Sequence, residues 1–145
     1  MIRKISVLDA DYMASAVQKG FSDGWNKKMI LSAFETGNFF GYVYVKNSNP
    51  IAFITYTAGI DGADIEDVFT EEGERNCGIA SALIESVIED IKKQGLKKIF
   101  LEVKEDNVGA IRLYKKFGFI KIAERKKYYS DGKTAFVLIK DIKDI

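Results

Sequence analysis

Apolar residues recur at intervals of three and four between residues 79 and 91. The series is Ile79, Ala80, Leu83, Ile84, Val87, Ile88 and Ile91. This spacing places one apolar stripe along a helix, so we expect a helix over residues 78–94 that ends at Gly95. A strand-like run, residues 65–70, precedes this helix, and a turn of mostly small residues, residues 75–80, joins the two.

The rest of the chain alternates between two patterns. In some segments every second residue is apolar, as in a strand, and in others the apolar residues have helical spacing. Expected strands cover residues 2–7, 39–46, 51–58, 63–70, 98–103, 119–126 and 134–140. The other expected helices cover residues 9–19, 26–36 and 107–117, with Asn26 and either Asp106 or Asn107 as caps. The order βααβββαβαββ predicts an α/β (α+β) fold, a mixed central sheet flanked by helices.

The turn between the 65–70 strand and the long helix has the features of an anion site. The first N–H groups of a helix have no partner within the helix, and the helix dipole favours negative charge there. Gly78 and Ala80 have little side chain to block those amides. The pattern therefore favours a cofactor with a diphosphate, although an ordinary strand-to-helix connection can also contain a glycine.

Composition limits the class of protein. A chain of 145 residues with 47% hydrophobic and 30% charged residues predicts one globular domain over residues 1–145. A net charge of +1 gives no basic field for nucleic acid or an anionic membrane. Neither a spanning apolar run nor a signal peptide is found, and a single cysteine fits a reducing compartment, so we expect a cytoplasmic protein.

The sequence contains no histidine. This excludes Ser-His and Cys-His nucleophilic machinery and, with only one cysteine, argues against a metal site. Acid–base chemistry therefore falls to glutamate, aspartate, tyrosine, lysine, a terminus or water.

A second group of residues follows the strand Leu101-Glu102-Val103. It consists of Asn107 and then Ala110-Ile111-x-Leu113-Tyr114-x-Lys116-x-Gly118-Phe119. Together with Arg75-x-x-Gly78-x-Ala80, this group resembles the GNAT superfamily of acyl-CoA N-acyltransferases over nearly the whole chain. Within it, the sequence is most similar to bacterial ribosomal-protein-alanine N-acetyltransferases, through Phe21-x-Asp23-x-Trp25-Asn26, the Leu-Glu-Val strand, and Arg125-Lys126-x-Tyr128-Tyr129 before Asp131-Gly132.

The resemblance implies acetyl-CoA as cofactor, with CoA as product and no metal. The turn amides would bind the pyrophosphate, the preceding strand would pair with the pantetheine arm, and Asn107 would contact that arm. The implied cofactor-binding residues are Val68, Phe69, Thr70, Arg75, Asn76, Cys77, Gly78, Ile79, Ala80 and Asn107. The resemblance also implies that Tyr114 protonates the departing thiolate and that Glu102 is the general base.

The chemistry of acyl transfer supports these roles. An α-ammonium has a pKa of about 7.7–8.0 and a lysine ammonium one of about 10.4, so deprotonation at pH 7 costs roughly 1 and about 4–5 kcal/mol. A single carboxylate is a plausible base for the α-ammonium, which is the easier of the two to deprotonate. The resemblance, supported by this chemistry, implies direct transfer from acetyl-CoA to the N-terminal amine of a protein, such as a ribosomal protein. Aromatic residues are the candidates for the acceptor pocket: Trp25, Tyr128 and Tyr129.

Each candidate also has an ordinary structural explanation. Glu102 fits a solvent-facing strand position, Tyr114 fits a core position, Asn107 fits a helix cap, and the three aromatic residues fit loop packing. In addition, Thr70-Glu71-Glu72-Gly73-Glu74 departs from the family pattern, because its glutamates oppose an anionic ligand unless they point away.

Two other functions remain open at this point. The first is a GNAT enzyme for a small amine such as a polyamine, an antibiotic or an amino acid, for which a closed acidic pocket would be expected. The second is a non-catalytic acyl-CoA-binding module. We expect a monomer or homodimer that binds neither nucleic acid nor membrane.

Overall fold

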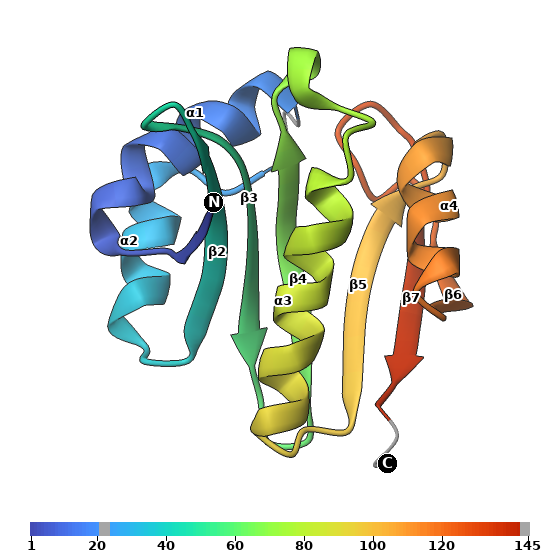
Figure 1. Ribbon diagram of the computed structural model, residues 1–145. Helices are drawn as coiled ribbons and strands as arrows, with labels where there is room; N and C mark the ends of the chain where they lie inside the picture. The colour runs from blue at the N-terminus through green and yellow to red at the C-terminus, as the bar shows by residue number, and fades with distance from the viewer. Residues whose placement is uncertain (21–23, 143–145) are drawn as a thin grey trace.

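The computed structural model describes residues 1–20 and 24–142, and it contains one seven-stranded sheet with helices on both faces (Figure 1). The strands are β1 (Ile2–Lys4), β2 (Phe39–Lys46), β3 (Asn49–Ala58), β4 (Gly62–Thr70), β5 (Lys98–Lys104), β6 (Ile120–Arg125) and β7 (Ala135–Asp141). The helices are α1 (Ala10–Gly20), α2 (Lys27–Glu35), α3 (Ile79–Lys93) and α4 (Val108–Lys116), with short 3₁₀ turns η1 (Val7–Asp9) and η2 (Glu72–Glu74). The expected order of helices and strands is confirmed.

Two expected strand boundaries are wrong, each for a local reason. The first strand ends at Lys4 because Ser6 and Asp9 form a capping box that begins η1, and Arg3 pairs with Asp9 at 2.8 Å. The third strand begins at Asn49 because Asn47 and Ser48, both with positive φ, form a tight hairpin turn.

The sheet has the strand order β1-β2-β3-β4-β5-β7-β6, and the pairing of β4 with β5 is its parallel contact. That pairing covers residues 62–64 of β4 and 98–100 of β5. Beyond these residues the two strands separate towards their C-terminal ends, as Figure 1 shows. The separation leaves the backbone of residues 65–70 without a neighbouring strand on that side.

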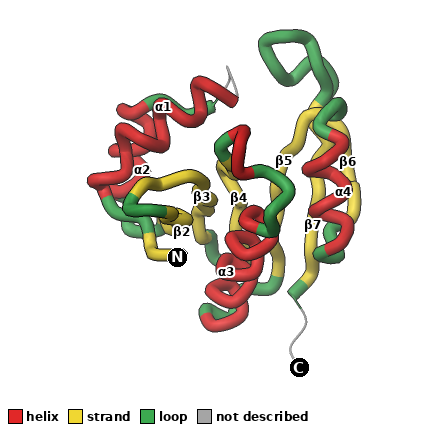
Figure 2. Tube along the Cα trace, turned by 45° about the horizontal axis from the view of Figure 1, so that its top comes forward, coloured by secondary structure: helices red, strands yellow, loops and turns green. Residues whose placement is uncertain are grey.

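Two hydrophobic clusters lie on opposite faces of the sheet. The apolar stripe of α3 is buried as expected, and Leu83, Ile84 and Val87 pack against β3, β4 and β5. On the other face α1 and α2 cover Phe53 and Phe69. Figure 2 shows this pair of helices on the side of the sheet away from α3. Burying a Leu or Ile side chain stabilises a fold by roughly 1.5–3 kcal/mol, so these clusters hold the frame around the separated strands.

A polar cluster ties α3 to the sheet. The hydroxyl of Tyr42 donates to Asp90 at 2.5 Å, and the hydroxyl of Tyr56 donates to the other carboxylate oxygen at 3.1 Å. Gln94 donates to the Tyr56 oxygen at 3.0 Å. These bonds fix the C-terminal half of α3 and so the direction in which its N-terminus points.

Candidate active site

The separation of β4 and β5 opens a cleft of about 1350 Å³. Its wall includes both strands, the N-terminus of α3, one face of α4 and the loop that precedes β7. The structure brings nearly all the sequence-predicted site residues into this wall, namely Trp25, Val68, Phe69, Thr70, Arg75, Asn76, Gly78, Ile79, Ala80, Glu102, Asn107, Tyr114, Tyr128 and Tyr129. Cys77 lies in the same turn, but it is exposed and forms no part of the wall.

The turn before α3 leaves its backbone open to a ligand. Gly78 is the N-cap, with φ of 77° in the left-handed region, and no side chain caps the first turn of α3. Asn76 also has a positive φ, 64°. No atom lies within 4 Å of the place where a Cβ on Gly78 would be. The first amides of α3 therefore face an open approach, as an anion requires.

The glutamates before this turn are held by lysines. Glu71 lies 3.9 Å from Lys19 of α1, and Glu74 lies 3.0 Å from Lys46 of β2. Arg75 donates from its Nε to the carbonyl of Thr70 at 3.1 Å, which closes the turn. These ion pairs offset two of the negative charges that the sequence places next to the predicted anion site.

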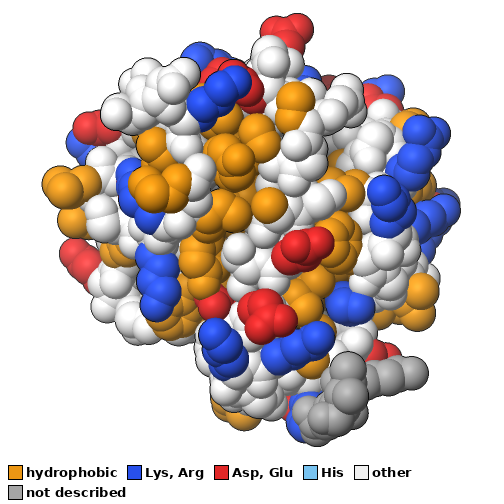
Figure 3. Space-filling model, in the orientation of Figure 1, with side chains coloured by type: hydrophobic (Ala, Val, Ile, Leu, Met, Phe, Trp, Pro, Cys, Tyr) orange, Lys and Arg blue, Asp and Glu red, His pale blue; other side chains and the backbone are white. Residues whose placement is uncertain are grey.

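The start of α4 forms another part of the wall. Asn107 is the N-cap of this helix, and its Oδ1 accepts from the amide of Ala110 at 3.2 Å. The expected capping role is therefore confirmed. Basic residues Arg112, Lys115 and Lys116 lie exposed on α4, and Figure 3 shows blue side chains gathered over this helix.

Tyr114 is the most buried polar group in the part of the cleft that α4 forms. Its side chain is 6% exposed and packs edge-on against Phe119 at 5.6 Å. Its hydroxyl has no hydrogen-bond partner among the described residues. Burial, together with the nearby charge of Asp67, raises the pKa of Tyr114 above its ordinary value. The phenol therefore stays protonated at neutral pH and can donate a hydrogen bond into the cleft.

Glu102 lies on the face of β5 opposite to its core residues. Ile99, Leu101 and Val103 point into the α3 cluster, and the alternation of the strand turns Glu102 to the other side. Arg125 of β6 places its Nε 3.5 Å from Oε1 of Glu102, and the Glu102 side chain is 31% exposed. This ion pair, which the sequence did not predict, holds the carboxylate at the cleft.

Three carboxylates on β4 also line the cleft, and sequence reasoning missed them: Asp64, Glu66 and Asp67. Their side chains have no hydrogen bond or ion pair with any described residue. Burial raises the pKa of Asp67 to about 6. Burial, with repulsion from Asp64, Asp67 and Glu102, raises the pKa of Glu66 to about 7. The three acids within residues 64–67 of an expected strand were the available signal.

The three aromatic residues expected in the acceptor pocket lie in the wall of the cleft. Trp25 stacks on Phe39 at 5.6 Å, which anchors it to the α1–α2 side. Tyr128 and Tyr129 pack edge-on at 5.2 Å in the loop between β6 and β7. These residues therefore pack against neighbouring rings and also form part of the cleft wall. Phe21 and Asp23, which belong to the same sequence motif as Trp25, lie outside the described residues.

Neither a metal site nor a spanning helix is found in the described parts of the chain. Within residues 1–20 and 24–142, no group of His, Cys, Asp and Glu side chains could hold a metal ion. Among the helices in those ranges, none is long and apolar enough to cross a bilayer.

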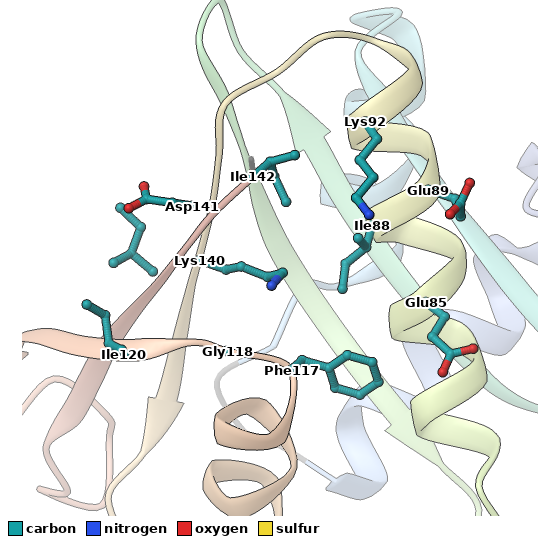
Figure 4. A pocket seen from close by; sticks show the side chains of 11 residues that line it. Glu85, Ile88, Glu89, Lys92, Phe117, Gly118, Ile120, Lys140, Asp141 and Ile142 are labelled. Atoms are coloured by element: carbon teal, nitrogen blue, oxygen red, sulfur yellow. The ribbon is translucent and has the colours of Figure 1, made fainter. Parts of the chain in front are cut away.

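A second hollow of about 680 Å³ lies between α3, the end of α4 and β7 (Figure 4). Phe117 and Lys140 extend into it, with Glu85 and Lys92 on the helix opposite. Its wall mixes acidic, basic and apolar groups and includes none of the predicted site residues. We assign it no function.

Comparison with known proteins agrees with this geometry. The sequence model of the acetyltransferase (GNAT) family matches residues 8–119. The [ribosomal protein bS18]-alanine N-acetyltransferase of Escherichia coli K12 is 25% identical over 124 residues, which cover 84% of this chain and 83% of that protein.

Solved structures show the same fold. The ribosomal-protein-S18-alanine N-acetyltransferase from Escherichia coli superposes with a TM-score of 0.90 at 24% identity, covering 100% of this chain and 95% of that one. Ard1 from Thermoplasma volcanium superposes with a TM-score of 0.88 at 26% identity, covering 99% and 98%. The match of the family model over most of the chain shows that this protein belongs to the acetyltransferase (GNAT) family.

Proposed function

We propose that this N-acetyltransferase transfers an acetyl group from acetyl-CoA to the N-terminal α-amine of a protein, by direct attack in a ternary complex. The observation that carries the proposal is the cleft between β4 and β5. It joins an open helix N-terminus, a buried phenol and a carboxylate in one continuous wall. The relatives named for bS18-alanine acetylation support a ribosomal protein as acceptor. We further propose that residues 1–145 act as one catalytic domain, because all seven strands share one sheet.

The residues fit acetyl-CoA, which supplies the activated acetyl thioester when bound. The open amides of residues 76–80 are suited to the pyrophosphate, with Arg75 adding positive charge. The free backbone edge of Val68–Thr70 is suited to pair with the pantetheine arm and to hold the oxyanion. Asn107 lies at the start of α4, where it can contact the same arm while it caps the helix.

Two side chains are proposed to take part in proton transfer. Glu102 is proposed to bind the acceptor amine and help to remove its proton, because its carboxylate lines the cleft with Arg125 3.5 Å from Oε1. Tyr114 is proposed to donate its proton to the departing sulfur, because its hydroxyl is protonated, buried and without a partner among the described residues. Trp25, Tyr128 and Tyr129 are proposed to enclose the first residues of the acceptor.

A specific observation favours a second candidate, a GNAT enzyme for a small cationic amine. The carboxylates of Asp64, Glu66 and Asp67 lack partners among the described residues, and such a wall attracts a cation. A polyamine and a protein N-terminus are both cations at neutral pH, so the charge of the cleft alone does not separate them.

The test is incubation of the purified protein with acetyl-CoA and a panel of acceptors, read by mass spectrometry. The panel contains peptides with a free N-terminus, the same peptides with a blocked N-terminus, polyamines and free amino acids. We expect acetylation of the free α-amine and none of the blocked peptides. Acetylation of polyamines alone would overturn the peptide proposal in favour of the second candidate. Absence of transfer to every amine, with CoA bound, would favour the non-catalytic module.

A further inference from the structure

The tip of the loop between β6 and β7, residues 126–134, is fastened to the end of β5. Lys104, the last residue of β5, places its Nζ 2.8 Å from Oδ2 of Asp131. The other carboxylate oxygen of Asp131 accepts from the amide of Lys133 at 2.9 Å. These bonds, first the one from Lys104, lower the pKa of Asp131, so its carboxylate is charged at neutral pH. Asp131 therefore joins the tip of the loop to β5.

The base of the same loop is held separately, by the residues that follow β5. The amide of Glu105 donates to the carbonyl of Thr134 at 2.9 Å, and the amide of Thr134 donates to Oε2 of Glu105 at 2.8 Å. Lys133 also lies 3.7 Å from Asp106. Because these contacts do not involve the Lys104 side chain, its loss should loosen the tip of the loop and leave the base in place.

Lys104 contacts an aromatic ring as well as a carboxylate. Its Nζ lies 5.1 Å from the centroid of the Tyr129 ring. Tyr129 packs edge-on against Tyr128, and the guanidinium of Arg125 lies over the Tyr128 ring at 5.6 Å. A cation over an aromatic face is attracted by the charge distribution of the ring. The two tyrosines are therefore held between two cations, one from β5 and one from β6.

The position of Lys104 on β5 places this contact in the cleft. Side chains two residues apart on a strand share a face, so Lys104 lies on the same side of β5 as Glu102. Both residues line the cleft, as do Tyr128 and Tyr129. One strand thus carries the carboxylate proposed to bind the amine and the lysine that contacts the aromatic wall.

We propose that Lys104 is a positioning residue for the acetyl acceptor, which holds Tyr129 and the tip of the β6–β7 loop in the cleft wall. The inference rests on the proposed function, in which Tyr128 and Tyr129 enclose the first residues of the acceptor. A wall that is already fixed loses less conformational entropy when a ligand binds, so the contact lowers KM for the acceptor. Lys104 acts through Asp131 and the Tyr129 ring and takes no part in proton transfer.

The first experiment compares Lys104→Met with Lys121→Met. Lys121 is a matched control, because its Nζ lies 2.6 Å from Glu124 and 4.0 Å from the centroid of the Phe136 ring, outside the cleft wall. For K104M we expect acceptor KM to rise about five- to tenfold, with kcat and the KM for acetyl-CoA within about twofold of the wild type. K121M should match the wild type. An unchanged acceptor KM in K104M would overturn the inference.

The second experiment tests whether Lys104 acts through Asp131. Asp131→Asn removes the charge and keeps an oxygen for the turn, so acceptor KM should rise about two- to fivefold. Lys104→Arg keeps the positive charge and should recover part of the loss seen in K104M. The double variant K104M/D131N should be no worse than K104M, because residues in direct contact are not additive. Fully additive effects on KM would show that the two residues act independently and would contradict the proposed role.

The third experiment measures the loop without an acceptor. The amide of Gly132 donates to the carbonyl of Tyr129 at 2.9 Å, so its hydrogen exchange reports on the tip. K104M should speed this exchange and K121M should not, whereas equal exchange in K104M and the wild type would refute the contact as the support of the tip. An active wild type whose acceptor KM does not depend on Lys104 refutes only this inference. A wild type inactive on all amines refutes the proposed function itself.

Discussion

The Nε of Arg125 lies 3.5 Å from the carboxylate of Glu102, although strand β7 separates the two strands that carry them. Arg125 reaches across β7 and also places its guanidinium over the Tyr128 ring, at 5.6 Å. One arginine thus connects the proposed amine-binding carboxylate with the aromatic acceptor wall. This arrangement couples the position of the loop before β7 to the orientation of Glu102.

Arg125→Gln should therefore weaken acceptor binding more than it slows chemistry. A partly exposed ion pair contributes about 0.2–1 kcal/mol, so we expect KM for a peptide acceptor to rise about two- to fivefold. Arg125→Lys keeps the positive charge and should recover part of this loss. Steady-state kinetics with acceptor varied at saturating acetyl-CoA provide the measurement, and a fall in kcat with no change in KM would contradict the expectation.

Tyr114→Phe should separate catalysis from cofactor binding. The substitution removes the phenol and keeps the ring that packs on Phe119. We expect kcat to fall by about 10²-fold, as for loss of a general acid, while calorimetry shows CoA affinity within about twofold of the wild type. Because the pKa of Tyr114 is raised, its ionisation should not reduce the wild-type rate up to about pH 10. If Y114F were as active as the wild type, Tyr114 would have only a packing role in the core.

The left-handed glycine at the N-terminus of α3 offers a test of the anion site. Gly78→Ala places a Cβ on a residue with φ of 77°, at a cost of about 1–2 kcal/mol, and brings a methyl group next to the open amides. Gly95→Ala is the matched control, since Gly95 has φ of 73° at the other end of the same helix. Both variants should lose similar stability in urea, but only G78A should weaken CoA binding in calorimetry. Equal CoA affinity in the two variants would argue against the turn as the pyrophosphate site.

The tyrosine pair on Asp90 predicts how stability depends on pH. Burial and the hydrogen bonds to Asp90 raise the pKa of Tyr42 and of Tyr56 above the ordinary value of about 10. The folded state therefore keeps these protons where the unfolded chain loses them, and the free energy of unfolding should fall as pH rises above about 10. Urea unfolding at several pH values gives the measurement. Tyr42→Phe should flatten this dependence, and an equally steep fall in Y42F would contradict the assignment.

Asp90→Ala tests the same cluster at neutral pH. It leaves two tyrosine hydroxyls without their acceptor, so we expect a loss of about 1–3 kcal/mol in the free energy of unfolding. Glu89→Ala, one residue away on the same helix, is the control and should change stability by less than about 0.5 kcal/mol.

Local patterns predicted the helices and strands well where short-range chemistry decides the conformation. The apolar stripe from Ile79 to Ile91 is buried on α3, and Asn26 and Asn107 cap the helices that they were expected to cap. The same patterns misplaced the ends of the first and third strands, because a capping box and a two-residue turn decide those boundaries. The resemblance of the motifs to the GNAT family is confirmed, while the roles of the individual site residues stay predictions.

The sequence by itself determined the order of elements and the family, since each depends on neighbouring residues and their spacing. Only the tertiary structure decided which side chains share the reaction space. Arg125 reaches Glu102 across an intervening strand, and Glu66 of β4 lines the same cleft as Glu102 of β5. Those positions depend on strand order, register and the separation of β4 from β5, which arise from packing between distant parts of the chain.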